Sequence, residues 1–293
     1  MSAAPPAGRA APQLASAVCS VVEGGPADGC RAIDLRAWDG LDVRLLPDRG
    51  LDCGAAWFRG VPLAWISEVG EVPPLARPQG ADWAGAFGGG LVTTCGLRNV
   101  GAPSEGYGLH GDVSHRRAAD VRARRVEHGA GDVELVVTGT VRDGPFALAR
   151  EWRVRTGTGA VTLRDETTNE GSDAEAAPLL YHVNLGAPLW APGARVSGRT
   201  AGVRPRDADA APHAERWAFA PEHDPAAPER VFEHELLRAD DGHGQLEVEH
   251  PALGLRVTVR WDAGPMQRAH QWVHPALGVL GIEPANCSVL GRA

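Results

Sequence analysis

Apolar and polar residues alternate with a period of two in several segments of the chain, which is typical of strands with one buried face. The clearest segments are residues 133–137, 146–154, 161–165, 245–249 and 255–261. Turn-forming residues separate them, at 142–145, 156–159 and 240–242. Short strands between regular turns predict an all-β sandwich or barrel.

Helical periodicity is nearly absent, and the best short candidate is 81–87, where Trp83 and Phe87 are four residues apart. No G-x-G-x-x-G segment follows a strand, so we do not expect a dinucleotide-binding domain. Three long stretches have little strand pattern: 71–90, 96–117 and 193–224. Long irregular loops in a compact domain are commonly functional. The third is rich in Ala and Pro, and we interpret it as an excursion rather than a site.

The chain of 293 residues is long enough for one large β domain, which we place at residues 16–293. Residues 1–15 are rich in Ala and Pro and predict a disordered tail. This segment lacks the apolar region of a signal peptide. Apolar runs elsewhere are much shorter than the roughly 20 residues that span a bilayer. We therefore expect a cytoplasmic protein that does not insert into a membrane.

The charged residues exclude several classes of function. The net charge is −8, which disfavours nucleic acid as a partner, because a phosphate backbone requires a basic surface. The chain contains no lysine, so all 29 basic residues are arginine. Schiff-base aldolase chemistry, pyridoxal phosphate chemistry and the P-loop all require a lysine, and the sequence therefore excludes them.

The cysteines do not suggest a disulfide framework or a thiolate metal site. They are five in number and scattered, with no C-x-x-C motif: Cys19, Cys30, Cys53, Cys95 and Cys287. We expect reduced thiols.

Histidines in polar surroundings and one carboxylate are the candidates for chemistry. The histidines lie at His110, His115, His182, His223 and His274. An apolar strand at 278–282 leads directly to Glu283, which Pro284 follows. A carboxylate in such a position is costly to bury, so it usually has a partner or a catalytic task.

Two of these residues lie in motifs that resemble those of galactose mutarotases, the aldose 1-epimerase superfamily. Residues 165–171 and 181–186 are similar to the strand–loop–strand segment that carries the general acid of that family. Residues 281–284, Gly-Ile-Glu-Pro, resemble the strand that carries its general base. The resemblance therefore implies His182 as the acid and Glu283 as the base.

Further segments extend the resemblance over residues 35–290. Leu109-His110-Gly111 is similar to a Leu-His-Gly motif of the family, and Arg98-Asn99 to its substrate-binding Asn-Arg pair. The segments at 46–52 and 57–63 resemble a subgroup of bacterial aldose-epimerase-like proteins that is classed as a domain of unknown function. Gly-Leu-His-Gly-Asp, Tyr-His-x-Asn and Glu-Pro-Ala-Asn-Cys are also similar to motifs of that subgroup.

The resemblance implies a large antiparallel β-sandwich and the interconversion of anomers, or a related epimerisation, of an aldose or aldose derivative. A small-molecule sugar is the expected partner, no cofactor or metal is expected, and a homodimer is left open. His182 and Glu283 should act from opposite sides of one sugar ring, roughly 5–8 Å apart, with Glu283 controlling the acid limb of the pH profile and His182 the basic limb. The expected substrate-binding residues are Arg98, Asn99, His110, His115, Asn184, Trp272 and His274.

Departures from the family pattern leave alternatives open. The acid motif is shortened to His-x-Asn, the Arg–Asn order is reversed, and only Asp224 and Glu229 are candidates for the family's hydroxyl-binding aspartate. One alternative is a metal-dependent sugar isomerase, and another is a carbohydrate-binding protein without activity. The metal ligands would come from His110, His115, His182, His274 and Glu283. Separately, Arg49 and Asp52 predict a structural ion pair at a turn.

Overall fold

The regular secondary structure of the protein is almost entirely β-strand. The computed structural model describes residues 14–129, 131–237 and 241–292. Residues 1–13 of the predicted tail lie outside the described residues. The prediction that the tail reaches residue 15 is wrong, because Leu14 and Ala15 are both buried and Ala15 begins the first strand.

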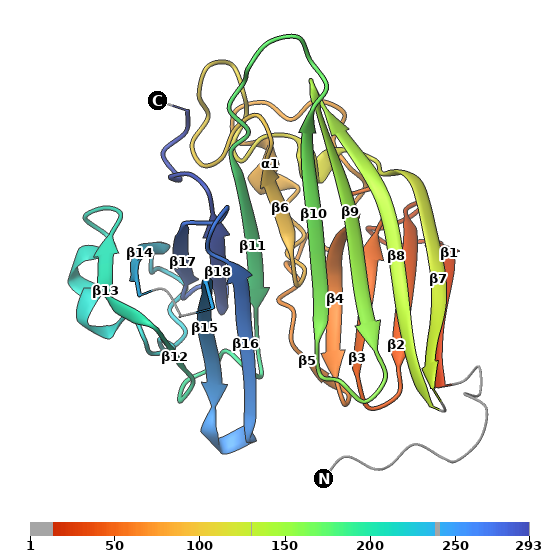
Figure 1. Cartoon of the computed structure of the whole chain (residues 1–293). Helices are drawn as coiled ribbons and strands as arrows, with labels where there is room; N and C mark the ends of the chain where they lie inside the picture. Colours follow the sequence, from red (N-terminus) through yellow and green to blue (C-terminus); the bar gives the residue numbers. More distant parts are fainter. Residues whose placement is uncertain (1–13, 130, 238–240, 293) are drawn as a thin grey trace.

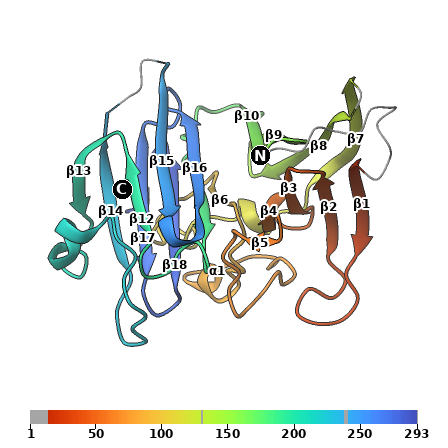
Figure 2. The same ribbon diagram turned by 90° about the horizontal axis from the view of Figure 1, so that it is seen from below.

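Two antiparallel sheets face each other in the N-terminal half of the chain (Figures 1 and 2). The first has the order β1-β2-β3-β4-β5, with β1 (Ala15–Val21), β2 (Arg31–Ala37), β3 (Leu41–Leu46), β4 (Asp52–Phe58) and β5 (Val61–Pro62). The second has the order β10-β9-β8-β7, with β7 (Ala119–Gly129), β8 (Asp132–Asp143), β9 (Phe146–Arg155) and β10 (Val161–Asn169). The strands predicted at 133–137, 146–154 and 161–165 are confirmed.

Alternate residues of both sheets fill a common core. Leu35 and Leu45 point inward from the first sheet, and Val137, Leu148 and Trp152 from the second, and all five belong to one buried cluster. Successive residues of a strand point to opposite faces, so every second side chain reaches this core.

The C-terminal half adds a six-stranded and a three-stranded sheet. The larger has the order β13-β14-β17-β18-β11-β6, with β6 (Thr93–Gly96), β11 (Leu179–Leu185), β13 (Thr200–Pro205), β14 (Arg230–Leu236), β17 (Arg268–His274) and β18 (Val279–Ala285). The smaller has the order β12-β15-β16, with β12 (Arg195–Gly198), β15 (His243–His250) and β16 (Leu255–Asp262). The predicted strands at 245–249, 255–261 and 278–282 fall within β15, β16 and β18.

The stretch 193–224 is more regular than its sequence suggested. It contains β12, β13 and the short helix η3 (Ala211–Arg216). Both strands are mostly exposed, and only Val196 is fully buried in them, so the apolar alternation that marks a strand is missing.

The other helices are short: α1 (Asp82–Gly85), η2 (Val113–His115) and η4 (Pro251–Leu253). The predicted helix at 81–87 is therefore shorter than expected, although Trp83 and Phe87 do stack, with ring centroids 4.5 Å apart. No helix in the described ranges is long and apolar enough to cross a membrane.

The six-stranded sheet is covered on both of its faces. Figure 2 shows the β12-β15-β16 layer on one side of β17 and β18, and the segment that contains α1 on the other.

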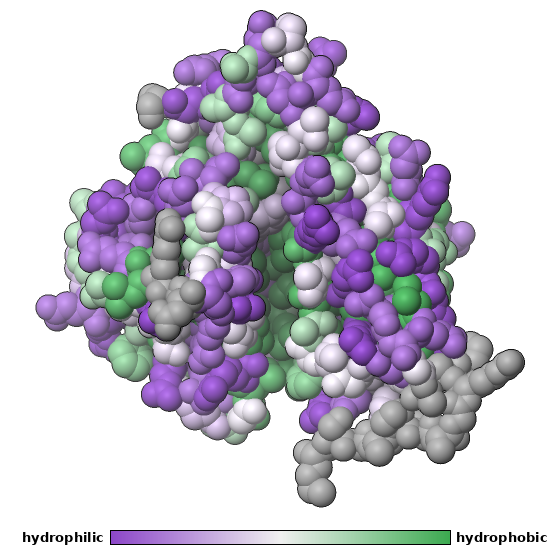
Figure 3. All heavy atoms as spheres, viewed as in Figure 1, coloured by the Kyte–Doolittle hydropathy of each residue, from purple (hydrophilic) through white to green (hydrophobic). Residues whose placement is uncertain are grey.

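The molecular surface is hollowed between β16 and β10, and hydrophobic residues line this hollow (Figure 3). Leu163 of β10 and Val257 of β16 are partly buried and pack against the core.

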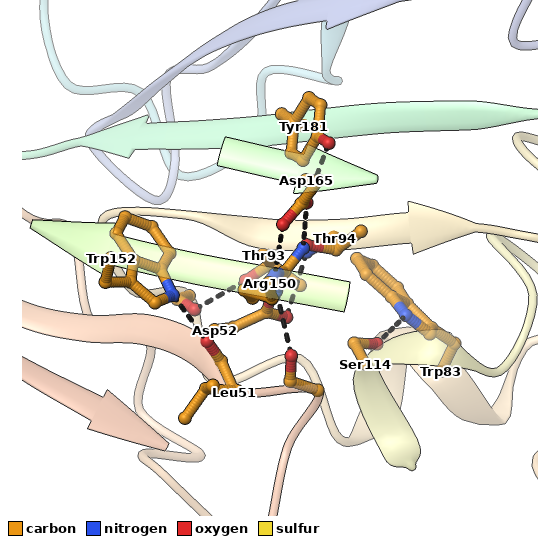
Figure 4. A network of polar contacts seen from close by, with 12 residues as sticks. Leu51, Asp52, Trp83, Thr93, Thr94, Ser114, Arg150, Trp152, Asp165 and Tyr181 are labelled. Carbon is orange, nitrogen blue, oxygen red and sulfur yellow. Dashed lines mark hydrogen bonds and ion pairs between the residues drawn. The ribbon is translucent and has the colours of Figure 1, made fainter. Parts of the chain in front are cut away.

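A buried arginine joins the two halves of the molecule (Figure 4). Arg150 on β9 has no exposed side-chain surface, and it forms ion pairs with Asp52 at 2.5 Å and with Asp165 at 2.7 Å. Asp52 also accepts hydrogen bonds from the backbone and the hydroxyl of Thr94 on β6. Asp165 accepts a bond of 2.7 Å from the hydroxyl of Tyr181 on β11. Five strands of three sheets thus meet at one guanidinium group.

This network corrects the expected pairing of Arg49 with Asp52. The carboxylate of Asp52 does fix the turn, but its partner is Arg150, which also donates to the carbonyl of Gly50 at 2.8 Å. The guanidinium of Arg49 instead donates to the carbonyl of Val72 at 3.2 Å.

We predict that Arg150→Met strongly destabilises the protein. The substitution leaves two carboxylates buried without their cation, which typically costs about 3–5 kcal/mol. Arg153→Met on the same strand is the matched control, because Arg153 is partly exposed and solvent screens its ion pairs with Glu134 and Glu151, so their loss should change the stability little. Urea unfolding measures both variants, and equal losses of stability would contradict the structural role of Arg150.

Candidate active site

His182 and Glu283 come together on one face of the six-stranded sheet. His182 lies on β11 and Glu283 on the neighbouring strand β18, and both side chains are almost completely buried. Nε2 of His182 is 3.1 Å from a carboxylate oxygen of Glu283. The expected separation of 5–8 Å is therefore wrong, and no sugar ring fits between the two groups.

Aromatic rings enclose this pair on the side that faces α1. The ring centroid of His182 lies 5.2 Å from that of Trp272 on β17 and 5.3 Å from that of Phe87. His110 lies 6.2 Å from His182 and also packs on Trp83, at 4.6 Å. The loops that were predicted to be functional, 71–90 and 96–117, therefore contribute Trp83, Phe87 and His110 to the site.

Gly281 leaves open the space beside the pair. A Cβ atom at this position would lie 2.8 Å from Oε1 of Glu283 and 2.9 Å from Cε1 of His182. It would also come within 3.2 Å of Cβ of Trp272. Any side chain at position 281 would thus displace one of the three, so the strand requires glycine here.

Burial opposes a charge on either member of the pair. It raises the pKa of Glu283 to about 7 and lowers the pKa of His182 to about 4. Burial also lowers the pKa of His110 to about 3. Between pH about 4 and 7 the pair is therefore neutral, with the proton on Glu283. The pKa of His182 thus lies below that of Glu283, which is the reverse of the order that we expected from the sequence.

A second polar group lies beside Trp272. Its indole N–H donates to Glu229 at 2.8 Å, and Arg206 forms an ion pair with the same carboxylate at 2.8 Å. The charge of Glu229 acts on His110, His182 and Glu283. Of the two acidic candidates from the sequence, Glu229 is therefore the one near the pair. Asp224 instead accepts a bond from the backbone of Ala226.

Asn184 and His274 lie at the edges of the site. The amide of Asn184 is fully buried and donates to the carbonyls of Gly90 and of His182, so it fixes the backbone of β11 at His182. The ring of His274 lies 5.9 Å from that of Trp272 and is partly exposed.

Three of the predicted substrate-binding residues point elsewhere. The guanidinium of Arg98 stacks on Tyr107 at 4.6 Å. Asn99 is buried and donates to the carbonyls of Ala102 and Gly108, so it shapes the loop. Nδ1 of His115 accepts a bond from the backbone of Leu75, and Arg49 and Arg116 lie near its ring. In all three cases a local partner uses the polar group.

His270 is a site residue that we did not predict. It is buried on β17, directly opposite Glu283 in the strand register. The sequence did carry a signal, because His270, Trp272 and His274 alternate along one strand and must share a face.

The metal alternative depends on several ligands meeting at one point. Among the described residues, no three His, Cys, Asp or Glu side chains are grouped so that they could hold a metal ion. His115 in particular is bonded to the backbone of Leu75, whereas His182 contacts Glu283.

Comparisons with known proteins agree with this fold. The structure is similar to a candidate aldose 1-epimerase from Klebsiella pneumoniae, with a TM-score of 0.84 and 22% identity, over 93% of this chain and 75% of that chain. It is also similar to a galactose mutarotase-like protein from Clostridium acetobutylicum, with a TM-score of 0.61 and 12% identity, over 94% of this chain and 89% of the other. No protein of curated function matches the sequence.

The sequence itself identifies the family. Residues 27–293 match the family described as a domain of unknown function, DUF4432. The β-sandwich fold that the motifs predicted is thereby confirmed, and so is the subgroup classed as a domain of unknown function. The chain belongs to the DUF4432 family and has the galactose mutarotase-like fold.

Proposed function

We propose that this protein is a carbohydrate isomerase that interconverts the anomers, or a related pair of epimers, of an aldose or aldose derivative. His182 and Glu283 are its acid–base pair. The observation that carries the proposal is their contact of 3.1 Å, buried beneath aromatic rings. The candidate epimerase and mutarotase-like proteins of similar fold support it.

The short distance between the two groups suits this reaction. The two oxygens that exchange protons, the anomeric hydroxyl and the ring oxygen, are bonded to the same carbon. An acid and a base that lie side by side can therefore serve both from one side of the sugar. This arrangement replaces the expected one, in which the ring lay between them.

The neutral pair can move the required protons. We infer that His182 protonates the ring oxygen through Nδ1, because its other ring nitrogen, Nε2, is occupied by Glu283 at 3.1 Å. Nδ1–H gives its proton to the ring oxygen while Nε2 takes the proton of Glu283. The C1–O5 bond breaks, with its electrons on O5, and the Glu283 carboxylate takes the anomeric hydroxyl proton. The product is the open-chain aldehyde, and Glu283 ends protonated again.

The surrounding residues provide for binding. Trp272 and Phe87 offer apolar faces to the C–H side of a sugar. His110 is neutral at physiological pH, and Glu229 is partly exposed, so both can bond to hydroxyl groups.

We expect Glu283→Gln to lower kcat by about 10²–10⁴-fold with little change in KM, because the proton transfer is lost while the shape is kept. Anomer exchange measured by NMR on aldoses, uronates and keto-sugars, with a chelator present, provides the assay. Glu247→Gln on β15, the central strand of the three-stranded sheet, is the control. An undiminished kcat, or activity only with added Zn²⁺ or Mn²⁺, would support the metal alternative. Sugar binding without turnover in the wild type would indicate a binding protein.

The dependence of kcat/KM on pH should be bell-shaped, because the proposed mechanism requires the neutral form of the pair. Below pH about 4 His182 gains a proton, and above pH about 7 Glu283 loses one. The neutral pair therefore exists only between these two pH values. Activity that keeps rising from pH 7 to 9 would contradict the mechanism.

Glu283→Gln should also stabilise the protein at high pH. The folded pKa of Glu283 lies above its ordinary value of 4.5, so folding is disfavoured as pH rises from about 4.5 through 7. The loss amounts to at most about 3 kcal/mol, and the contact with His182 offsets part of it. We expect the Tm gain of the variant to be larger at pH 8 than at pH 5. An equal gain at both pH values would show that Glu283 has no such shift.

A further inference from the structure

A row of acidic and imidazole side chains crosses four strands of the six-stranded sheet. Glu233 on β14 lies opposite His270 on β17, and His270 lies opposite Glu283 on β18. Glu283 then contacts His182 on β11. Directly opposed residues in antiparallel strands point to the same face, with Cβ atoms about 4.5–5.5 Å apart. Each carboxylate in this row therefore has an imidazole as its next neighbour.

We propose that His270 is a positioning residue, which lies beside Glu283 on the same face of the sheet and favours the ionised form of its carboxyl group. The catalytic meaning of this role rests on the proposed isomerase function. The role itself concerns only Glu283 and can be tested without a substrate.

The position of His270 is fixed by the backbone. Its side chain is 3% exposed, and Nε2 lies 3.3 Å from the carbonyl oxygen of Cys287. A carbonyl can only accept a hydrogen bond, so Nε2 carries a proton. The ring is thus held by the chain just beyond the end of β18, beside Glu283.

Several titratable or charged groups face Glu283. They are His182, His270, Glu229, Arg206 and Cys95. After burial, which raises the pKa of Glu283, the largest influence is that of His270, which lowers it. The smaller effects of Glu229 and Arg206 oppose each other. His270 is therefore the neighbour that most strongly limits how far burial can suppress the carboxylate.

The outer end of the row is an ion cluster near the surface. Glu233 is paired with Arg268 at 2.7 Å and with Arg204 at 3.1 Å, and about one fifth of its side chain is exposed. His270 lies between Glu233 and Glu283 in the strand register. Glu233 thus acts on Glu283 indirectly, and its effect should be the smaller.

The test is a ¹³C NMR titration of the Glu283 carboxyl group, assigned with Glu283→Gln. In His270→Gln, which keeps a donor for Cys287, we expect the midpoint to move upward by about half to one pH unit. Glu233→Gln should move it in the same direction by less. His234→Gln is the matched control, because His234 is equally buried on the opposite face of the sheet, 3.1 Å from Gln271. It should leave the midpoint unchanged.

An unchanged or lowered Glu283 midpoint in folded His270→Gln would overturn the proposal, as would an equal shift in His234→Gln. If His270→Gln does not fold, Glu233→Gln decides, since it alters the partly exposed end of the row. Failure of the isomerase function would appear differently, as a shifted midpoint in a protein that turns over no sugar. With a substrate in hand, the basic limb of kcat/KM should move with the midpoint while KM stays constant.

Discussion

The fully buried ion pairs of Arg150 are the constraint on which the rest of the structure depends. A guanidinium without solvent contact needs carboxylates, and the chain supplies Asp52 and Asp165 from strands that are more than 100 residues apart. Thr94 and Tyr181 complete the network from the third sheet. Apolar packing alone would allow these sheets to slide, whereas charged groups of fixed geometry allow one arrangement only.

The same strands that close this network also carry the candidate site. On β11, Tyr181 reaches the network while the next residue, His182, points to the opposite face and meets Glu283. On β6, Thr94 binds Asp52 and its neighbour Thr93 lies opposite His182 in the register. Because successive side chains alternate in direction, the position of the network determines the position of His182.

Much of the fold could be predicted because alternation is a local signal. Strands such as β8 and β16 can be recognised in the sequence because the residues of their more buried face are apolar. The strands β12 and β13 are too exposed to show this alternation. The pairing of His182 with Glu283 followed from the resemblance of two motifs to those of the mutarotases, and both residues lie within strands, β11 and β18. Arg98 and Asn99 could not be placed, because a loop side chain takes whichever partner its own loop offers, and here these are Tyr107 and two backbone carbonyls.

The lack of a side chain at Gly281 shows that the strands and the loops of the site differ in the substitutions they can accept. The floor of the site consists of hydrogen-bonded strands, and there even one methyl group would strike His182, Glu283 or Trp272. The roof consists of irregular segments that carry Phe87 and His110, where insertions and exchanges are tolerated. We therefore expect exchanges around Phe87 and His110 to leave the fold intact, whereas position 281 accepts only glycine.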